Sequence, residues 1–205
     1  DIHFLRGRVL TKLSRFVEAE NAYREVISLD GKYQGAWFNM GTNYLRQNKT
    51  PQAIYSYNNE MKTHPSAQTM VQIGKAYSEL GKPDSALVSF EKAIHINKIF
   101  APAYMRLSHL KKDAGDINEA IAYAKKGMDI DPDNIDYKYF MGSLLLLNGE
   151  PKLSIPLFNE VVNDKPWHYW AHHNLGQALF RAGNKTQSEY YITKAKDLQK
   201  GIQEV

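Results

Sequence analysis

The strongest constraint in this sequence is a repeat of about 34 residues that occurs six times. A small residue marks its first column, at steps of 34, 33, 34, 34 and 34 residues: Gly7, Gly41, Gly74, Ser108, Gly142 and Gly176. One unit of this size cannot bury its apolar face alone, so neighbouring units must stack to form a continuous core. The sequence therefore predicts an array of similar units.

Three further columns keep the same spacing. The second column is small: Ala19, Ala53, Ala86, Ala120, Ser154 and Ser188. The third is mostly large and apolar: Tyr23, Tyr57, Phe90, Ala124, Phe158 and Ile192. The fourth suits the left-handed backbone at which a helix ends: Ser14, Asn48, Gly81, Gly115, Gly149 and Gly183. Apolar residues recur at helical spacing, so each repeat is expected to be two helices in close contact.

A pattern of W-x2-L-G-x2-Y, then A-x3-F, then P resembles the tetratricopeptide repeat family. The second repeat fills these slots, with conservative changes, by Trp37, Met40, Gly41, Tyr44, Ala53, Tyr57 and Pro65. The resemblance covers essentially the whole chain and implies an all-α fold, a right-handed α-solenoid of stacked antiparallel helix pairs. We expect a single array over residues 1–205, with repeats at about 1–33, 34–66, 67–100, 101–134, 135–168 and 169–202.

Local signals mark the start of the second helix in several repeats. Pro51, Pro83 and Pro151 suit the first helical position, where a missing N–H costs nothing. Asp116 followed by Glu119 is typical of a capping box. These signals predict helices that begin just after the fourth column.

Composition excludes several functional classes. The chain has no cysteine, which removes disulfides, zinc thiolate sites, iron–sulfur clusters and cysteine nucleophiles. No apolar run reaches the roughly 18 residues of a membrane span, so no membrane insertion is expected. A net charge of +4 favours acidic partners and is too small to favour nucleic acid. The chain also lacks a phosphate-binding loop, a nucleophile elbow and a zinc-protease motif, so we expect no enzyme activity and no cofactor.

The resemblance implies a concave groove, lined by the first helix of each repeat, as the place where a ligand binds. Groove positions here are basic and aromatic, which suits an acidic or aromatic protein or peptide segment. Ten residues are expected to carry this binding: Phe38, Asn39, Arg46, Lys75, Arg106, His109, Tyr139, Trp170, Asn174 and Arg181. The alternative is that the cations are merely solvated and that Phe38 and Tyr139 pack the repeats together.

Two binding chemistries of the family can be compared with these residues. A two-carboxylate clamp needs Lys, Asn, Asn, Lys and Arg at positions held here by Phe4, Arg8, Asn39, Gln68 and Gln72. Only Asn39 matches, so we reject the clamp. An asparagine ladder would use the column Leu5, Asn39, Gln72, Arg106, Phe140 and Asn174, of which four are polar. The sequence thus predicts at most a degraded ladder.

Two short stretches resemble metal sites. His168 and His172 are four residues apart and could share a helix face, but no Asp or Glu nearby completes a ligand set. The run DIDPDNID at 129–136 resembles the start of a calcium loop but lacks its glycine and its final glutamate. We therefore expect packing and turn roles for these residues, and no metal site.

The ends of the array leave alternatives open. The first helix starts at Asp1 without a full first turn, and no separate capping helix follows the sixth repeat. We therefore expect either self-association through uncapped ends or continuation in a larger protein. The leading interpretation is a non-catalytic scaffold that binds a protein or peptide segment. The alternatives are the repeat portion of a larger enzyme or assembly complex, recruiting substrate or mediating oligomerisation, and a standalone structural oligomer.

Overall fold

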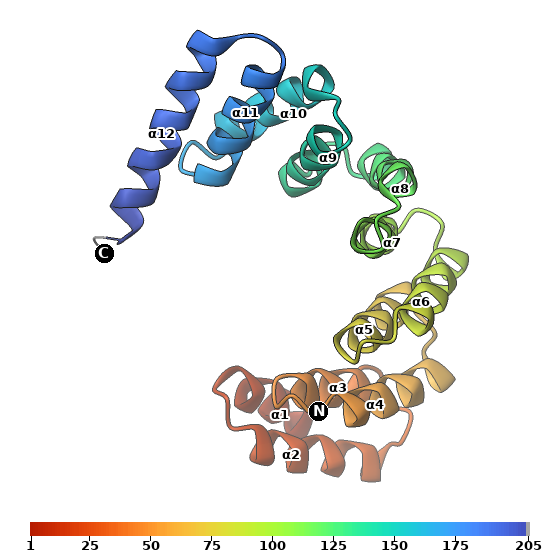
Figure 1. Ribbon diagram of the computed structural model, residues 1–205. Coiled ribbons are helices and arrows are strands. Elements are labelled where there is room, and N and C mark those ends of the chain that lie inside the picture. Colours follow the sequence, from red (N-terminus) through yellow and green to blue (C-terminus); the bar gives the residue numbers. More distant parts are fainter. Residues whose placement is uncertain (204–205) are drawn as a thin grey trace. The chain divides into compact units, whose positions relative to one another are not determined.

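The computed structural model describes residues 1–203, and within this range every regular element is an α-helix (Figure 1). In chain order the helices are α1 (Ile2–Lys12), α2 (Phe16–Leu29), α3 (Ala36–Leu45), α4 (Thr50–Thr63), α5 (Ala67–Glu79), α6 (Pro83–Ile96), α7 (Ala101–Asp113), α8 (Ile117–Ile130), α9 (Ile135–Leu147), α10 (Pro151–Asp164), α11 (Tyr169–Arg181) and α12 (Lys185–Gln203). The predicted all-α solenoid of antiparallel helix pairs is confirmed. Each predicted repeat range contains one pair of helices, and only α12 extends past its range, by one residue.

The chain divides into two compact units within α7: the first runs from Asp1 to Arg106, and the second begins at Leu107. In the first unit, α2 packs against α3 and α4 packs against α5. In the second unit, α8 packs against α9 and α10 packs against α11. The second helix of one pair thus covers the first helix of the next pair within each unit. The description of the 205 residues as a single array stays a prediction.

Close contact between the two helices of a pair depends on the glycine column. A Cβ built on Gly7, Gly41, Gly74, Gly142 or Gly176 would lie between 2.4 and 2.9 Å from the third-column side chain of the same repeat. Real Cβ contacts are not that short, so any larger residue would force the helices or the ring to move. The predicted close approach at the small residues is confirmed.

The fourth repeat achieves the same contact with the sizes exchanged. Ser108 stands in the glycine column, is fully buried, and its hydroxyl donates a hydrogen bond to the Ala120 carbonyl at 2.6 Å. In the third column Ala124, also fully buried, replaces the ring. In this repeat the first helix therefore has a larger residue than glycine at the contact, and the second helix has a smaller residue than the usual ring.

The fourth column ends the first helix of each pair, as predicted. Ser14 and Asn48 have φ values of 59° and 57°, and the four glycines of the column lie between 67° and 92°. The left-handed backbone costs a side chain about 1–2 kcal/mol, which explains why glycine is preferred here. The predicted proline positions are also found, in the first turn of α4, α6 and α10.

The capping box expected at Asp116 and Glu119 is wrong. Asp116 stands at the N-cap of α8 but its side chain makes no capping hydrogen bond. The ammonium group of Lys111 lies 2.7 Å from a Glu119 carboxylate oxygen and 3.8 Å from one of Asp116. This cation attracts both carboxylates away from the backbone N–H groups.

The N-terminus of α3 is capped by a buried carboxylate of another helix, and not by a side chain of its own first turn. Glu60, on α4, is 4% exposed. Its two carboxylate oxygens accept hydrogen bonds from the backbone N–H of Gly35 at 2.9 Å and of Phe38 at 3.2 Å. Gly35, at the N-cap, has no side chain that could do this. The first turn of α3 is thus held by α4 of the same pair.

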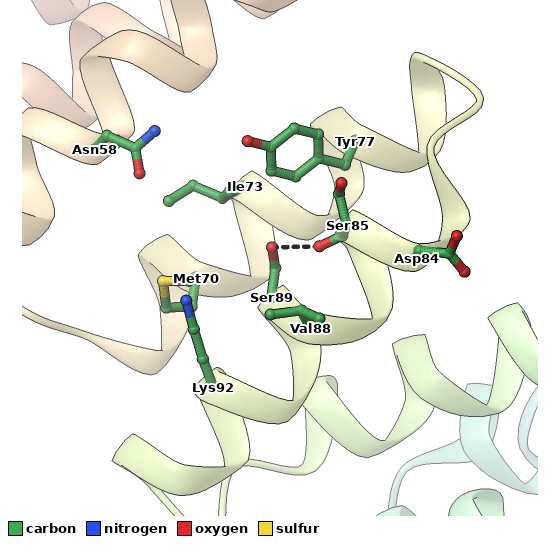
Figure 2. A pocket seen from close by; sticks show the side chains of 9 residues that line it. All are labelled: Asn58, Met70, Ile73, Tyr77, Asp84, Ser85, Val88, Ser89 and Lys92. Carbon is green, nitrogen blue, oxygen red and sulfur yellow. Dashed lines mark hydrogen bonds between the residues drawn. The ribbon is translucent and has the colours of Figure 1, made fainter.

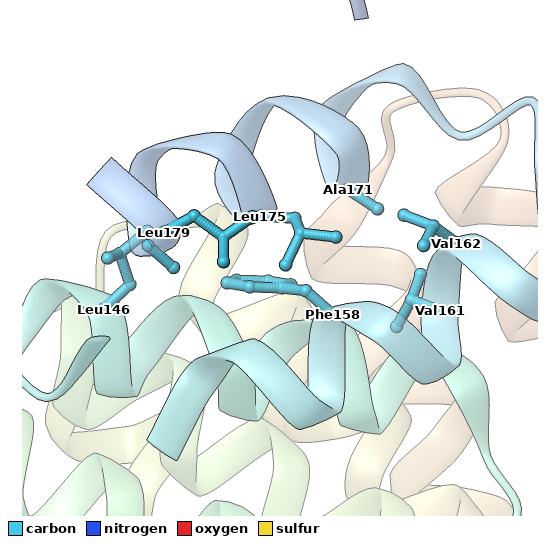
Figure 3. Close-up of a cluster of buried hydrophobic side chains, with 8 residues drawn as sticks. Leu146, Phe158, Val161, Val162, Ala171, Leu175 and Leu179 are labelled. Atoms are coloured by element: carbon cyan, nitrogen blue, oxygen red, sulfur yellow. The ribbon is translucent and has the colours of Figure 1, made fainter. Parts of the chain in front are cut away.

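The core of the second unit fixes the positions of α9 and α11. Phe158, on α10, is fully buried among Leu146, Leu175, Val161 and other aliphatic side chains (Figure 3). Burying a side chain of this size contributes about 2–3 kcal/mol. This core holds α9 and α11, which carry the polar and aromatic residues described below, against α10. Among the described residues, no helix is both long enough and apolar enough to cross a membrane.

Candidate functional site

In the first unit, the predicted binding residues of α3 are partly used by the fold. The Phe38 ring is half-buried, with its centroid 5.4 Å from that of Tyr57. The side-chain amide of Asn39 donates to the Gly35 carbonyl at 2.8 Å, within its own helix. Lys75, on α5, is partly exposed. On α3 and α5 the candidate ligand contacts are therefore Lys75 and an asparagine that is already hydrogen-bonded.

Two of the predicted residues, Arg46 and Arg181, have an intramolecular role that the sequence did not reveal. The Arg46 guanidinium donates to the Thr11 carbonyl at 3.2 Å, and that of Arg181 donates to the Leu146 carbonyl at 2.9 Å. Both carbonyls belong to the last turn of the preceding first helix, where a cation is favourable. A ligand would have to compete with these carbonyls. The arginine and the carbonyl residue are 35 residues apart in both pairs, and this repeated spacing could have indicated the two contacts from the sequence.

In the second unit, Tyr139 and Asn174 are brought together from α9 and α11. The Asn174 side-chain amide donates to the Tyr139 hydroxyl at 3.1 Å. The Tyr139 ring also lies 4.7 Å from the His168 ring and 6.0 Å from the Phe158 ring, between centroids. Burial raises the pKa of Tyr139, so its hydroxyl stays protonated near neutral pH. Asn174, which belongs to the column compared above with an asparagine ladder, is thus hydrogen-bonded to an aromatic hydroxyl that can also donate.

One face of α11 carries a row of exposed aromatic and polar side chains. Trp170 is 50% exposed, and its ring lies edge-on to that of His173 with 5.9 Å between centroids. The Gln177 amide donates to His173 Nε2 at 2.8 Å. Phe180, which is not among the ten residues predicted from the sequence, is 60% exposed. Its spacing of three residues from Gln177 and ten from Trp170 places it along the same side of the helix.

The remaining predicted residues lie on α7. Arg106 is exposed and is the last residue of the first unit. His109, in the second unit, stacks on Phe140 with 3.8 Å between ring centroids, and the Lys112 ammonium lies 5.8 Å from the same ring. Phe140 is thus flanked by two basic side chains.

The histidines that suggested a metal site are used in the fold. His168 Nδ1 accepts the Ala171 N–H at 3.2 Å and so caps α11. His172 is 1% exposed, and its Nε2–H donates to the Pro166 carbonyl at 2.9 Å. In the part of the chain that the structure describes, no three His, Asp or Glu side chains come together as metal ligands. The packing role is therefore the one that the contacts support.

The calcium-like run at 129–136 covers the end of α8, the turn after it and the start of α9. Asn134 caps this helix, since its side-chain oxygen accepts the Tyr137 N–H at 3.2 Å. Its amide group donates to an Asp131 carboxylate oxygen at 2.9 Å, and Asp136 pairs with Lys165 at 2.7 Å. The run therefore has a turn role, as expected, with Asn134 as the residue that caps the helix.

We expect His172 to make the second unit less stable in mild acid. Its Nδ1 is buried without a partner, and burial lowers its pKa below the ordinary value of 6.5. Neutral His172 contributes its full share to the free energy of unfolding above 6.5, the pKa in the unfolded chain. This contribution is lost as the pH falls from 6.5 toward the lower pKa of the folded chain, because the unfolded chain then binds more protons. His172→Phe should reduce the loss of melting temperature between about pH 8 and about pH 5. The same substitution at the exposed His95 should leave that loss unchanged; equal behaviour of the two variants would contradict the assignment.

Two hollows of the first unit lie where a first helix meets the second helices on either side of it, away from the predicted groove positions. The first, of about 450 Å³, is lined by Arg24, Trp37, Met40, Tyr44, Pro51, Gln52 and Tyr55. The second, of about 350 Å³, is lined by Asn58, Met70, Ile73, Tyr77, Asp84, Ser85, Val88, Ser89 and Lys92 (Figure 2). All seven positions that line the first hollow recur one repeat later in the second, with Tyr44 and Tyr77 in equivalent places, and the second adds Ser89 and Lys92. None of the ten predicted binding residues lines either hollow.

Known proteins with the same type of repeat match parts of this chain. Sequence profiles described as tetratricopeptide repeat match residues 1–33 and residues 77–144. The small glutamine-rich tetratricopeptide repeat-containing protein 2 of Mycosarcoma maydis is 31% identical over 83 residues, which is 40% of this chain and 24% of that relative. The matched stretch thus spans about a quarter of the relative's length.

Solved structures share the fold at low sequence identity. MamA has a TM-score of 0.71 at 22% identity, over 81% of this chain and 98% of that one. YrrB, described as a TPR protein with an unusual peptide-binding site, has a TM-score of 0.62 at 17% identity, over 83% of this chain and 89% of that one. The columns and the helix pairs agree with the two profile matches, which identify tetratricopeptide repeats at residues 1–33 and 77–144, and the solved structures share this fold.

Proposed function

We propose that this chain is a non-catalytic scaffold that binds an extended, acidic protein or peptide segment along its first helices. Protein or peptide binding is the general role of the family, and YrrB, a structural neighbour, is described as having a peptide-binding site. The finer proposal places the main contacts on α9 and α11 of the second unit. The observation that carries it is the Tyr139–Asn174 hydrogen bond beside the exposed Trp170.

This arrangement suits a peptide backbone. The Asn174 amide donates to Tyr139, and no donor to its carbonyl oxygen is found among the described residues. That oxygen can accept a peptide N–H, while the protonated Tyr139 hydroxyl can donate to a peptide carbonyl. Trp170 adds a large, half-exposed anchor of the kind that dominates interface energetics.

The preference for an acidic ligand rests on the charge of the first helices. Lys75, Arg106 and Lys112 carry cations at groove positions, and Arg46 and Arg181 add positive charge although their guanidinium groups already bond carbonyls. Carboxylates near such cations gain charge-assisted hydrogen bonds. Binding should therefore weaken as ionic strength rises.

The test is a peptide array of acidic, neutral and basic sequences, with and without aromatic residues, followed by fluorescence anisotropy on the best binders. We expect acidic peptides to be selected, and Trp170→Ala with Asn174→Ala to weaken their binding by about tenfold or more. Lys112→Glu, in the same unit as Trp170 and Asn174, should reduce the preference for acidic over neutral peptides. Tyr190→Ala, an exposed aromatic of α12, is the matched control and should bind normally.

A second candidate keeps the same helices but makes them the recruiting portion of a larger enzyme or assembly. The match to about a quarter of the Mycosarcoma maydis relative is compatible with such an arrangement. Under this proposal the groove variants would lower recruitment of a substrate or subunit rather than peptide binding itself. Selection of no peptide by the array, with loss of assembly in the same variants, would favour it.

A further inference from the structure

One exposed tryptophan lies outside the predicted groove positions. Trp167, in the turn between α10 and α11, is 67% exposed. Among the described residues its ring contacts no other ring, and its indole N–H donates no hydrogen bond. The equivalent residues of the preceding turns are exposed as well: Lys32, Pro65, Ile99 and Asp133. The exposure of Trp167 therefore follows from its place in the repeat, since turns with a repeat on both sides share it.

The second unit has an excess of negative charge around this tryptophan. Residues 131–138 and 160–170 contain five carboxylates and two ammonium groups: Asp131, Asp133, Asp136, Glu160 and Asp164, with Lys138 and Lys165. We call these two stretches the acidic edge. The stretches of the first unit that are equivalent to 131–138 are residues 30–37, 63–70 and 97–104, with net charges of 0, 0 and +1. The negative charge is thus a property of this edge and not of the repeat.

Salt bridges join the two stretches of the acidic edge. Lys165 Nζ lies 2.7 Å from a carboxylate oxygen of Asp136, and the Lys138 ammonium pairs with Glu160. Each ammonium group of the edge is therefore already neutralised by one carboxylate. The other three carboxylates form no salt bridge in the part of the chain that the structure describes.

Asp133 and Asp164 are exposed and serve no local contact. Neither side chain makes a hydrogen bond or an ion pair within residues 1–203. The pKa of Lys138 is raised, chiefly by its hydrogen bond to Glu160 and further by the charges of Asp133 and Asp164, so the two aspartates lie on the same side of the edge. Asp164 is the last residue of α10, where a negative charge opposes the helix dipole. Both carboxylates remain available to a ligand.

The acidic edge suits an extended polycation better than a metal ion. No three His, Asp or Glu side chains of the described residues come together as metal ligands, so the carboxylates are spread out. The face of an exposed tryptophan ring attracts a cation. The guanidinium group of arginine is planar, stacks on such a ring, and bonds a carboxylate through two parallel N–H groups. A lysine ammonium can do neither, so arginine is the better fit.

A second copy of this chain offers few suitable arginines. Four of the five arginines outside α1 are already bonded within the chain: Arg15 and Arg24 to glutamates, and Arg46 and Arg181 to carbonyls. Arg6 and Arg8 of α1 are two residues apart and so do not share a helix face. An extended segment can instead present several arginines along one line.

We propose that the acidic edge binds an extended segment of another protein that contains several arginines. One guanidinium stacks on Trp167, and others pair with Asp133 and Asp164. The ligand proposed above for the groove is acidic, so the two sites select peptides of opposite charge. Contacts at an exposed edge are individually weak, so this binding is measured in solution rather than on an array.

The first measurement follows the indole N–H signals of the three tryptophans by NMR during peptide titration. Trp167→Phe assigns the signal of Trp167. The probes are three eight-residue peptides in which serine alternates with arginine, lysine or glutamate. We expect the arginine peptide to shift the Trp167 signal, the lysine peptide to bind about threefold more weakly or less, and the glutamate peptide to leave the signal unchanged. The Trp37 N–H, bonded to the Gly31 carbonyl, is the internal reference.

The second measurement is fluorescence anisotropy of the labelled arginine peptide with variants of the chain. Asp133→Asn with Asp164→Asn should weaken its binding about fivefold or more, and Trp167→Ala should weaken it about threefold or more. Glu91→Gln removes an exposed carboxylate of α6, and Ile99→Ala truncates the residue equivalent to Trp167. Neither control should change the binding.

The outcomes separate this edge from the groove. Asn174→Ala should weaken the acidic peptides of the groove and leave the arginine peptide unaffected. Circular dichroism melts confirm that each variant is folded. Equal binding by the double aspartate variant and Glu91→Gln, or a Trp167 signal that moves no more than that of Trp37, would overturn the proposal. A dimer in light scattering that Trp167→Ala dissociates would assign the edge to a second copy and would also overturn a separate partner.

Discussion

Replacing Glu60 by alanine is expected to destabilise the first unit by about 3 kcal/mol. The Glu60 carboxylate is buried and accepts the N–H groups of Gly35 and Phe38. Alanine leaves both donors in the interior of the helix pair without a partner and removes a negative charge from the N-terminus of α3. Glu60→Gln keeps one acceptor oxygen and should cost less.

The measurement is urea denaturation followed by circular dichroism, together with hydrogen exchange of residues 35–38. In Glu60→Ala the exchange of these amides should accelerate more than that of α9, because the cap acts on α3. Glu91, exposed on α6, provides the matched control, and Glu91→Ala should change stability by less than about 0.5 kcal/mol. If the two alanine variants unfolded at the same urea concentration, Glu60 would not be the cap that holds α3.

Gly74 and Phe90 are expected to show the second large effect, in a double-mutant cycle. A Cβ at Gly74 would lie 2.4 Å from Phe90 Cε1, so Gly74→Ala should cost about 2–3 kcal/mol by overpacking. Phe90→Ala should cost about 3–5 kcal/mol by leaving a cavity. The double variant should be more stable than the sum predicts, because the new methyl group occupies part of the space that the ring leaves.

Ser108 and Ala124 are the natural precedent for that double variant, since they hold the glycine and ring positions of the fourth repeat. The cycle is read from urea midpoints, with Gly81→Ala as a control for the effect of glycine on the backbone alone. Gly81 has φ 67° and nothing within 4 Å of an added Cβ, so its cost should be independent of Phe90. Strict additivity of Gly74→Ala and Phe90→Ala would refute direct contact as the cause.

The sequence predicted the features that depend on spacing along one chain. The glycine at position 74 and the left-handed residue Asn48 recur at a fixed interval, and each has a local physical cause. The helix pairs follow from these columns because a helix needs a stop and a close contact needs a small residue. The packing of α9 against α10, for example, could be predicted from these columns alone.

Contacts that depend on rotamers and competing partners could not be predicted. Arg46 looked like a ligand residue because exposed cations on a first helix are typical of binding surfaces, but the Thr11 carbonyl lies within its reach. Asp116 had the right spacing for a capping box, but Lys111 attracts its carboxylate. The hollow lined by Tyr44 could not be predicted, because its walls come from three helices, α2, α3 and α4.

The exchanged sizes at Ser108 and Ala124 limit how this gene can be rearranged. A crossover between two repeats that joins α7 to α6, for example, would place Ser108 against Phe90 and crowd the interior. A crossover that moves both helices together keeps the matched residues and would be tolerated. The helix pair, rather than the single helix, is therefore the unit that can be duplicated or deleted without loss of folding, and new arrays should be designed by joining whole pairs.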